Sequence, residues 1–152
     1  PSAKIMNPKD IKICIIGLLI LILIFLGVSS GIHSTPKIYF GNNKVNLIIA
    51  DTEAKREKGL GGFTVLSSDT GMLFVFPESG IYPFWMKDMQ FPLDIIWLDE
   101  KCIITHIEKK VSPETYPESF VSDKNSLYVL ETNAGFVEKN NLKTGDICIL
   151  QK

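Results

Sequence analysis

Hydrophobic positions follow two different patterns along the chain and divide it into two parts. Residues 13–28 form an uncharged apolar run of sixteen positions, whereas from residue 37 onward short apolar segments alternate with turn residues. As a helix this run would be about 24 Å long, a little less than the ~30 Å thickness of a hydrocarbon core. Lys12 can lengthen the membrane-embedded segment, because its apolar stem can lie in the hydrocarbon while its amine reaches the surface.

The charges beside this run predict its orientation. Lys4, Lys9 and Lys12 precede it against one acid, Asp10, so the N-terminus is expected in the cytoplasm and the remainder outside. Two interpretations of residues 1–30 stay open: a retained membrane anchor, or a signal peptide cleaved near residues 28–30. A short polar linker is expected over residues 31–36.

Residues 37–152 predict a mainly β domain. Strand-like segments fall at 37–40, 44–50, 71–76, 82–87, 93–98, 102–111, 127–132 and 147–151, with short helices at 53–58 and 134–140 and a surface loop at 112–125. This pattern predicts a single compact antiparallel barrel or sandwich with two short helices. Parallel strands joined by long helices are not expected, because no helical segment exceeds about three turns.

The charge, the cysteines and the absence of known motifs limit which partners, cross-links and cofactors are expected. Without residues 1–30 the net charge is near −3 and no basic run occurs, so nucleic acid is not an expected partner. Cys102 and Cys148 are either small core residues or the two ends of a single disulfide. No cofactor motif is present, and His106 with Glu108 on one strand face provides too few ligands for a metal site.

The segment 83–99 is the best candidate for a site because it embeds charge in an apolar run. Lys87 and Asp94 each need a partner or water if they are buried. Strand alternation places Trp85 and Lys87 on one face and Met86 on the other. Trp85 is then either a stacking platform with Lys87 as a donor, or a cover for one end of the barrel beside a solvated lysine.

The two carboxyl groups within apolar strands also allow two interpretations. Asp94 is an acid, base or ligand acceptor in a cleft, or else a structural acid that holds the bend after Pro92, which is the favoured interpretation. Glu131 closes an apolar strand in a similar way, and a structural role is favoured there too.

Three segments carry a family resemblance. The stretches GMLFVFPESG at 71–80, FWMKDMQFPLDIIWLD at 84–99 and YVLETNAGFVEKNNLKTGD at 128–146 resemble, in order and spacing, the bacterial and archaeal DUF192 family of unknown function. The resemblance covers residues 44–150. It implies a compact, mostly β domain, often behind a signal peptide or an anchor, and it implies no established reaction.

The characteristic polar and aromatic residues of this family fall on a small set of positions: Trp85, Met86, Lys87, Pro92, Asp94 and Glu131. The chain departs from the family twice. Asp88 follows the lysine where the family commonly has asparagine, and Phe63 stands where it often has arginine. Arg56, the only arginine in the sequence, is the candidate for a compensating cation.

Two main functions are compatible with these observations. The first is an extracytoplasmic, membrane-tethered binding or accessory module for a small polar ligand or an envelope component. The second is a hydrolytic enzyme that uses Lys87, Asp94 and Glu131. A structural partner of another envelope protein, contacting it through residues 112–125 or an apolar patch, is a third. The expected location is the cell membrane with a single pass, or the exterior after signal cleavage.

Overall fold

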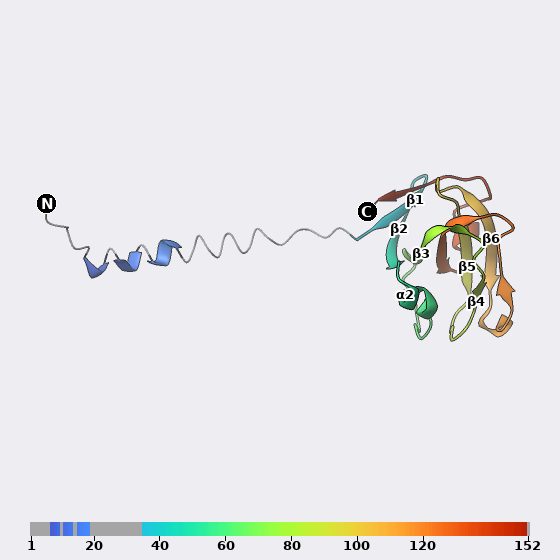
Figure 1. Ribbon diagram of the computed structural model, residues 1–152, viewed down its shortest axis with the longest axis horizontal. Helices are drawn as coiled ribbons and strands as arrows, with labels where there is room; N and C mark the ends of the chain where they lie inside the picture. The colour runs from blue at the N-terminus through green and yellow to red at the C-terminus, as the bar shows by residue number, and fades with distance from the viewer. Residues whose placement is uncertain (1–6, 10, 14, 19–34, 152) are drawn as a thin grey trace. The chain divides into compact units, whose positions relative to one another are not determined.

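The largest element of the protein is one seven-stranded sheet, in the order β6-β5-β8-β3-β2-β1-β9 (Figure 1). The computed structural model describes residues 7–9, 11–13, 15–18 and 35–151, and the β domain begins at Thr35. The strands are β1 (Lys37–Phe40), β2 (Asn43–Ala50), β3 (Thr70–Gly80), β5 (Leu93–Leu98), β6 (Ile104–Val111), β8 (Ser126–Asn133) and β9 (Cys148–Gln151). The prediction of a mainly β fold is confirmed.

One strand pair departs from the predicted antiparallel arrangement. β2 and β3 run parallel, with Ala50 opposite Phe74, while the other neighbouring pairs of this sheet are antiparallel. Residues 51–69 bring the chain back to the end of the sheet where β2 begins, and parallel neighbours need a connection of this kind. The prediction of a wholly antiparallel sheet was therefore wrong: a helix was expected at 53–58, but it was judged too short to connect two parallel strands.

The helix in this crossover, α2 (Glu53–Lys58), has the predicted bounds. The Thr52 hydroxyl caps it by accepting from the backbone N–H of Lys55 at 3.3 Å, and Gly59 ends it with φ of 50°. Such a positive φ is easily adopted only by glycine. The second helix, α3 (Phe136–Lys139), is shorter than the predicted 134–140.

The sheet curls because its two outer strands are joined at one end. A disulfide links Cys102, just before β6, to Cys148 at the start of β9, with the two Cα atoms 5.2 Å apart. The Cys148 N–H also donates to the Cys102 carbonyl at 2.7 Å, and the Ile104 N–H donates to the Asp146 carbonyl at 2.9 Å. The sheet is thus a half-barrel, and of the two interpretations of the cysteines the disulfide is the one observed.

Alternation along the strands gives the curled sheet two apolar faces. On β5, Ile96 and Leu98 belong to the cluster inside the curl, whereas Ile95 and Trp97 belong to the cluster on the opposite, outer face. The inner face is closed by the disulfide and by Val137 of α3. Both faces bury large side chains completely, so burial of the sheet on both sides provides most of the driving force for folding.

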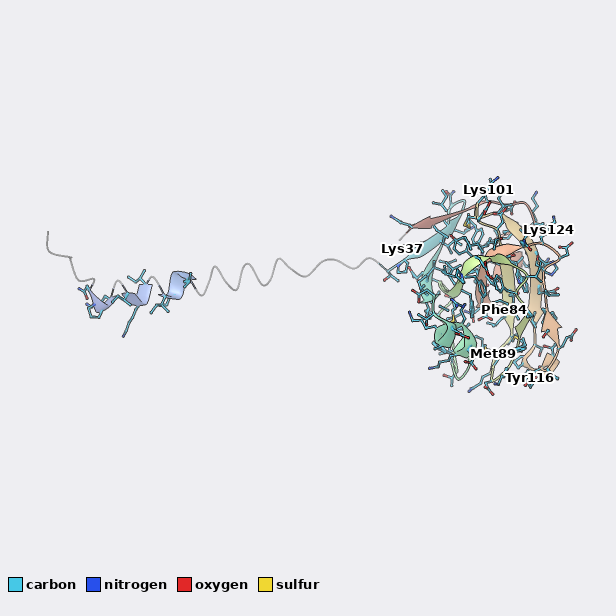
Figure 2. All side chains as sticks on the ribbon, in the orientation of Figure 1. Lys37, Phe84, Met89, Lys101, Tyr116 and Lys124 are labelled. Carbon is cyan, nitrogen blue, oxygen red and sulfur yellow. A yellow bond between two sulfur atoms is a disulfide. The ribbon has the colours of Figure 1, made fainter. Side chains whose placement is uncertain are left out.

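Separate small elements cover the outer face. The predicted strand at 82–87 is reduced to β4 (Phe84–Trp85), which pairs with β7 (Ser119–Phe120) in a second sheet. The predicted loop at 112–125 holds β7 and a 3₁₀ turn, Pro113–Thr115. Figure 2 shows Met89 and Tyr116 at the end of the domain opposite Lys101, which lies next to the disulfide.

Most of the predicted anchor or signal segment at 1–30 and most of the linker at 31–36 lie outside the described residues. Residues 8–9, 11–13 and 15–18 are helical. Within the described parts of the chain, no helix is both long and apolar enough to cross a bilayer.

Candidate functional site

A cleft of about 720 Å³ opens on the outer face of the sheet. It lies between α2 with the following glycine loop at 59–62, the strand β3, and the segment 82–89 that includes β4. Two kinds of side chain line it: aromatic residues Phe74, Phe76, Tyr82, Phe84 and Trp85, and charged residues Arg56, Glu57, Lys58, Lys87, Asp88 and Glu131.

The aromatic wall follows from alternation on β3. Phe74 and Phe76 both point to the outer face, where Tyr82 stacks on Phe76 with ring centroids 3.5 Å apart and Phe84 meets Phe74 edge to face at 4.8 Å. The Trp97 indole N–H donates to the Tyr82 carbonyl at 3.1 Å and holds this segment against the sheet. The wall is therefore a rigid set of rings fixed by its own packing.

Trp85 and Lys87 stand at the rim of the cleft. Trp85 is 51% exposed and Lys87 is exposed, while Met86 between them is buried in the outer cluster. The predicted alternation at these positions is confirmed. The side chain of Met86 helps to hold the segment and is not among the residues that line the cleft.

The glycine loop packs tightly against the turn that carries Lys87 and Asp88. A Cβ on Gly61 would lie 2.9 Å from the Lys58 carbonyl and 3.6 Å from the Asp88 Cβ, and the Gly62 N–H donates to the Asp88 carbonyl at 3.2 Å. These close approaches require glycine, which agrees with the expected tight loop. Asp88 has φ of 58°, a left-handed conformation that aspartate and asparagine tolerate better than most residues, so the departure at this position preserves the backbone.

Arg56 is already engaged within the wall. Its Nη1 donates to the Val75 carbonyl at 2.8 Å, and its guanidinium carbon lies 5.4 Å from the centroid of the Phe76 ring. At this distance a cation is attracted by the face of an aromatic ring. Phe63, the other departure from the family, packs against the outer cluster.

Glu131 is the buried charged residue of the cleft. It lies on β8 between Met72 of β3 and Ile95 of β5, and only 4% of it is exposed. Its Oε2 contacts no hydrogen-bond donor among the described residues. Burial without a partner raises the pKa of Glu131 from 4.5 to about 8, so the carboxyl group is mainly protonated at neutral pH.

Asp94 lies on the other face of the sheet, away from this cleft. Its Oδ1 accepts from the Lys110 N–H and its Oδ2 from the Val137 N–H, both at 2.8 Å. Asp94 pairs with Thr132 across β5 and β8, one register position from Glu131, so the two carboxyl groups point to opposite faces. Asp94 has a structural role, because it joins β6 to the first turn of α3, and it does not hold a local bend at Pro92.

The structure thus brings together four of the six predicted site residues: Arg56, Trp85, Lys87 and Glu131. It does not bring Met86 or Asp94 to the same opening. Sequence reasoning missed the aromatic wall, although Phe74 and Phe76 alternate on one strand in a way that signals a shared face. His106 bonds to Glu108 at 2.9 Å, and no group of three or more metal-binding side chains occurs within the described ranges.

Comparisons with known proteins identify solved structures and a protein family that are similar to this chain. Two crystal structures are similar at 27% identity and a TM-score of 0.70. One, from Sinorhizobium meliloti, is described as a candidate transcription regulator and is matched over 76% of this chain and 91% of its own. The other, from Novosphingobium aromaticivorans, is described as a protein of unknown function and is matched over 75% and 83%. No curated protein matches the chain. Residues 37–149 match the family described as DUF192, an uncharacterized ACR, and the chain therefore belongs to the DUF192 family.

Proposed function

We propose that the protein is an extracytoplasmic, membrane-tethered module that binds a small polar ligand or an envelope component in the outer-face cleft. The observation that carries the proposal is the half-exposed Trp85 beside Lys87 at the rim of a cleft with aromatic walls. A concave, mostly apolar site with a few polar groups is the usual form of a small-ligand site.

The rim and the base of the cleft would act on different parts of a ligand. The indole of Trp85 offers a flat surface on which a sugar or another ring can stack, and Lys87 can donate hydrogen bonds beside it. Glu131, deeper in the cleft, would contact the part of the ligand that enters furthest. The apolar run at 13–28 and its flanking lysines support the tethered, exported location.

Of the three residues that the hydrolytic alternative requires, Asp94 does not line the cleft. Lys87 and Glu131 line the cleft, whereas both oxygens of Asp94 are occupied by backbone donors on the other face. A paired-carboxylate mechanism needs both acids beside the same bond. We therefore favour binding over hydrolysis. A role in nucleic-acid binding is not proposed, because the chain is slightly acidic and has no basic run.

Tryptophan fluorescence provides a direct test because the chain has only two tryptophans. Trp97 is fully buried and Trp85 is 51% exposed, so quenching by a soluble quencher should come mainly from Trp85. Full-length protein in mild detergent would be titrated with cell-wall fragments and small polar molecules. A ligand in the cleft should protect Trp85 from the quencher.

Two variants separate stacking from simple proximity. Trp85→Ala should abolish the fluorescence change and weaken binding, measured by calorimetry, by about tenfold or more, whereas Trp85→Phe should retain part of the affinity. If no compound protects Trp85, or if Trp85→Ala leaves the affinity unaltered, the proposal is wrong. Protease accessibility of the domain in intact spheroplasts would test its location.

A further inference from the structure

We propose that the ligand of this cleft carries a protonated amine or guanidinium group, which pairs with Glu131 and displaces its proton. The inference rests on the proposed binding function and specifies the chemical class of its ligand: a small organic cation with a ring or an apolar body.

The first argument is the unpartnered carboxyl group. Glu131 is 96% removed from solvent, and its Oε2 contacts no donor within the described chain. Buried polar groups in native proteins nearly always have a partner, and an exception requires an explanation. A ligand that supplies the missing donor explains why a carboxyl group stands where an apolar residue would fit the cluster.

The second argument is that no cation in the described part of the chain supplies this donor. The guanidinium of Arg56 is bound to the Val75 carbonyl, and Lys87 is exposed at the rim. Burial is the cause of the raised pKa of Glu131, and no neighbouring cation offsets it. Glu131 thus lines the cleft without a cationic partner among the described residues.

The third argument is the aromatic wall. Cations are attracted to the faces of aromatic rings, and desolvated sites of this kind recognise organic ammonium ligands. Arg56 over Phe76 at 5.4 Å shows that this wall already accepts one guanidinium. A carboxyl group at the base and rings along the side together form a site for a cation with an apolar body.

The other charged groups that line the cleft are of both signs, three basic and two acidic, so the preference for a cation rests on Glu131 itself. From α2 the cleft receives Arg56, Glu57 and Lys58, and from the turn after β4 it receives Lys87 and Asp88. The only other titratable group on its walls is the phenol of Tyr82, which donates to the Glu78 carbonyl. The strands on either side contribute Met72 and Ile95 beside Glu131, which carry no charge.

Pairing with a cation requires proton release. In the free protein Glu131 holds a proton below about pH 8. When the ligand binds, the O–H bond breaks, the proton leaves to solvent, and the carboxylate pairs with the ligand cation, which keeps its own protons. Affinity should therefore rise by up to about tenfold per pH unit as the pH approaches 8 and should level off above it.

The experiment compares two probes of the same shape on the full-length protein in mild detergent. Phenethylammonium stays charged from about pH 6 to about pH 9, and 2-phenylethanol is its neutral counterpart. Calorimetry near pH 7 in two buffers with different ionisation enthalpies measures proton release. We expect the ammonium probe to bind at least tenfold more tightly than the alcohol at pH 8, and to release close to one proton per molecule bound in the measurement near pH 7.

Variants assign the effect to one carboxyl group. Glu131→Gln keeps the size and the hydrogen-bonding capacity of the side chain but removes the charge, so it should abolish the preference for the ammonium probe and the proton release. Its folding can be verified independently from the emission of the buried Trp97. Glu53→Gln, an exposed change on α2 that does not line the cleft, should leave both unaltered.

The outcomes separate this inference from the function on which it rests. Equal binding of the two probes, or binding in Glu131→Gln that equals that of the native protein, would overturn the inference. If neutral glycan fragments protect Trp85 while the ammonium probe does not bind, the inference fails and the binding function stands. If neither class binds, both are wrong.

Discussion

The two faces of the sheet differ in whether a buried carboxyl group has hydrogen-bond donors. On the inner face, each oxygen of Asp94 accepts a hydrogen bond from a backbone N–H, at 2.8 Å in both cases. Glu131 on the outer face, one register position away on the neighbouring strand, has an oxygen without any donor among the described residues. A carboxyl group that is fully satisfied has a structural role, whereas one left without a partner beside a cleft is available to a ligand.

The closure of the two faces explains this difference. The inner face is covered by the disulfide and by α3, and the hydrogen bonds of Asp94 lie among these elements. The outer face is covered by α2, the glycine loop and the β4–β7 pair, and these separate pieces leave a cleft between them. A cover built of small independent elements therefore leaves the opening that Glu131 lines.

Loss of the disulfide should be the largest perturbation of the inner face. The double variant Cys102→Ser/Cys148→Ser opens a loop with a sequence separation of 46, for which chain entropy predicts a loss of roughly 4 kcal/mol in the free energy of unfolding. Urea unfolding of the full-length protein would measure it, with Cys14→Ser as the control that keeps the bridge. A loss below about 1 kcal/mol would show that the backbone bonds between β6 and β9 close the sheet without the bridge.

Replacement of Asp94 tests whether the inner carboxyl is purely structural. Asp94→Ala leaves the partly buried N–H of Lys110 and the buried N–H of Val137 without acceptors and should lower the free energy of unfolding by about 3 kcal/mol. Asp94→Asn retains one acceptor and should lose less. If Asp94→Ala impairs ligand binding while the free energy of unfolding is unchanged, the division between the two faces is incorrect.

The free energy of unfolding should depend on pH through Glu131, the carboxyl group of the outer face. The pKa of Glu131 rises from 4.5 in the unfolded chain to about 8 in the folded protein, so between these values the folded state binds more protons. Its contribution to the free energy of unfolding is complete below about pH 4.5, decreases as the pH rises, and is lost above about pH 8.

Glu131→Gln should remove this dependence. Because water in the cleft can solvate part of the ionised carboxylate, we expect the variant to be more stable than the native protein by about 2 kcal/mol at pH 9 and to differ little at pH 4. Thermal unfolding across this range would measure the difference. A difference between variant and native protein that does not change with pH would mean that Glu131 has a donor in solution.

Removal of the rim indole should have the smallest effect on folding. Trp85 is half exposed, so Trp85→Ala should change the free energy of unfolding by less than about 0.5 kcal/mol. Trp97→Ala, in contrast, empties a fully buried site and should lower it by about 3 kcal/mol or more. If Trp85→Ala destabilises the protein to a similar extent, Trp85 covers the barrel end and is not a ligand platform.

Local patterns in the sequence were sufficient to predict the individual helices and strands, but not how the strands pair with one another. The helix at 53–58 and the alternation of Trp85, Met86 and Lys87 were predicted correctly, because each depends on neighbouring residues only. The parallel pairing of β2 and β3 depends on contacts between segments that are distant in sequence, and the short helix expected at 53–58 did not by itself indicate a crossover between parallel strands.

The candidate site depends on register in the same way. The sequence indicates that Asp94 and Glu131 both interrupt apolar strands, but only the pairing of Asp94 with Thr132 places the two acids on opposite faces. A shift of one residue would have brought them together. The amine of Lys87 and the carboxyl group of Asp94 were expected at one opening, and the structure puts Glu131 there in place of Asp94.

The pairing of β1 with β9 has a consequence for the order in which the domain can be built. Lys37 lies directly opposite Gln151, so the first and last strands of the domain are neighbours (Figure 1). A short peptide could connect them, and new ends could be opened in the exposed turn at residues 123–125. Such a circular permutant would retain every strand pair described here, since the sheet is defined by which strands meet and not by where translation starts.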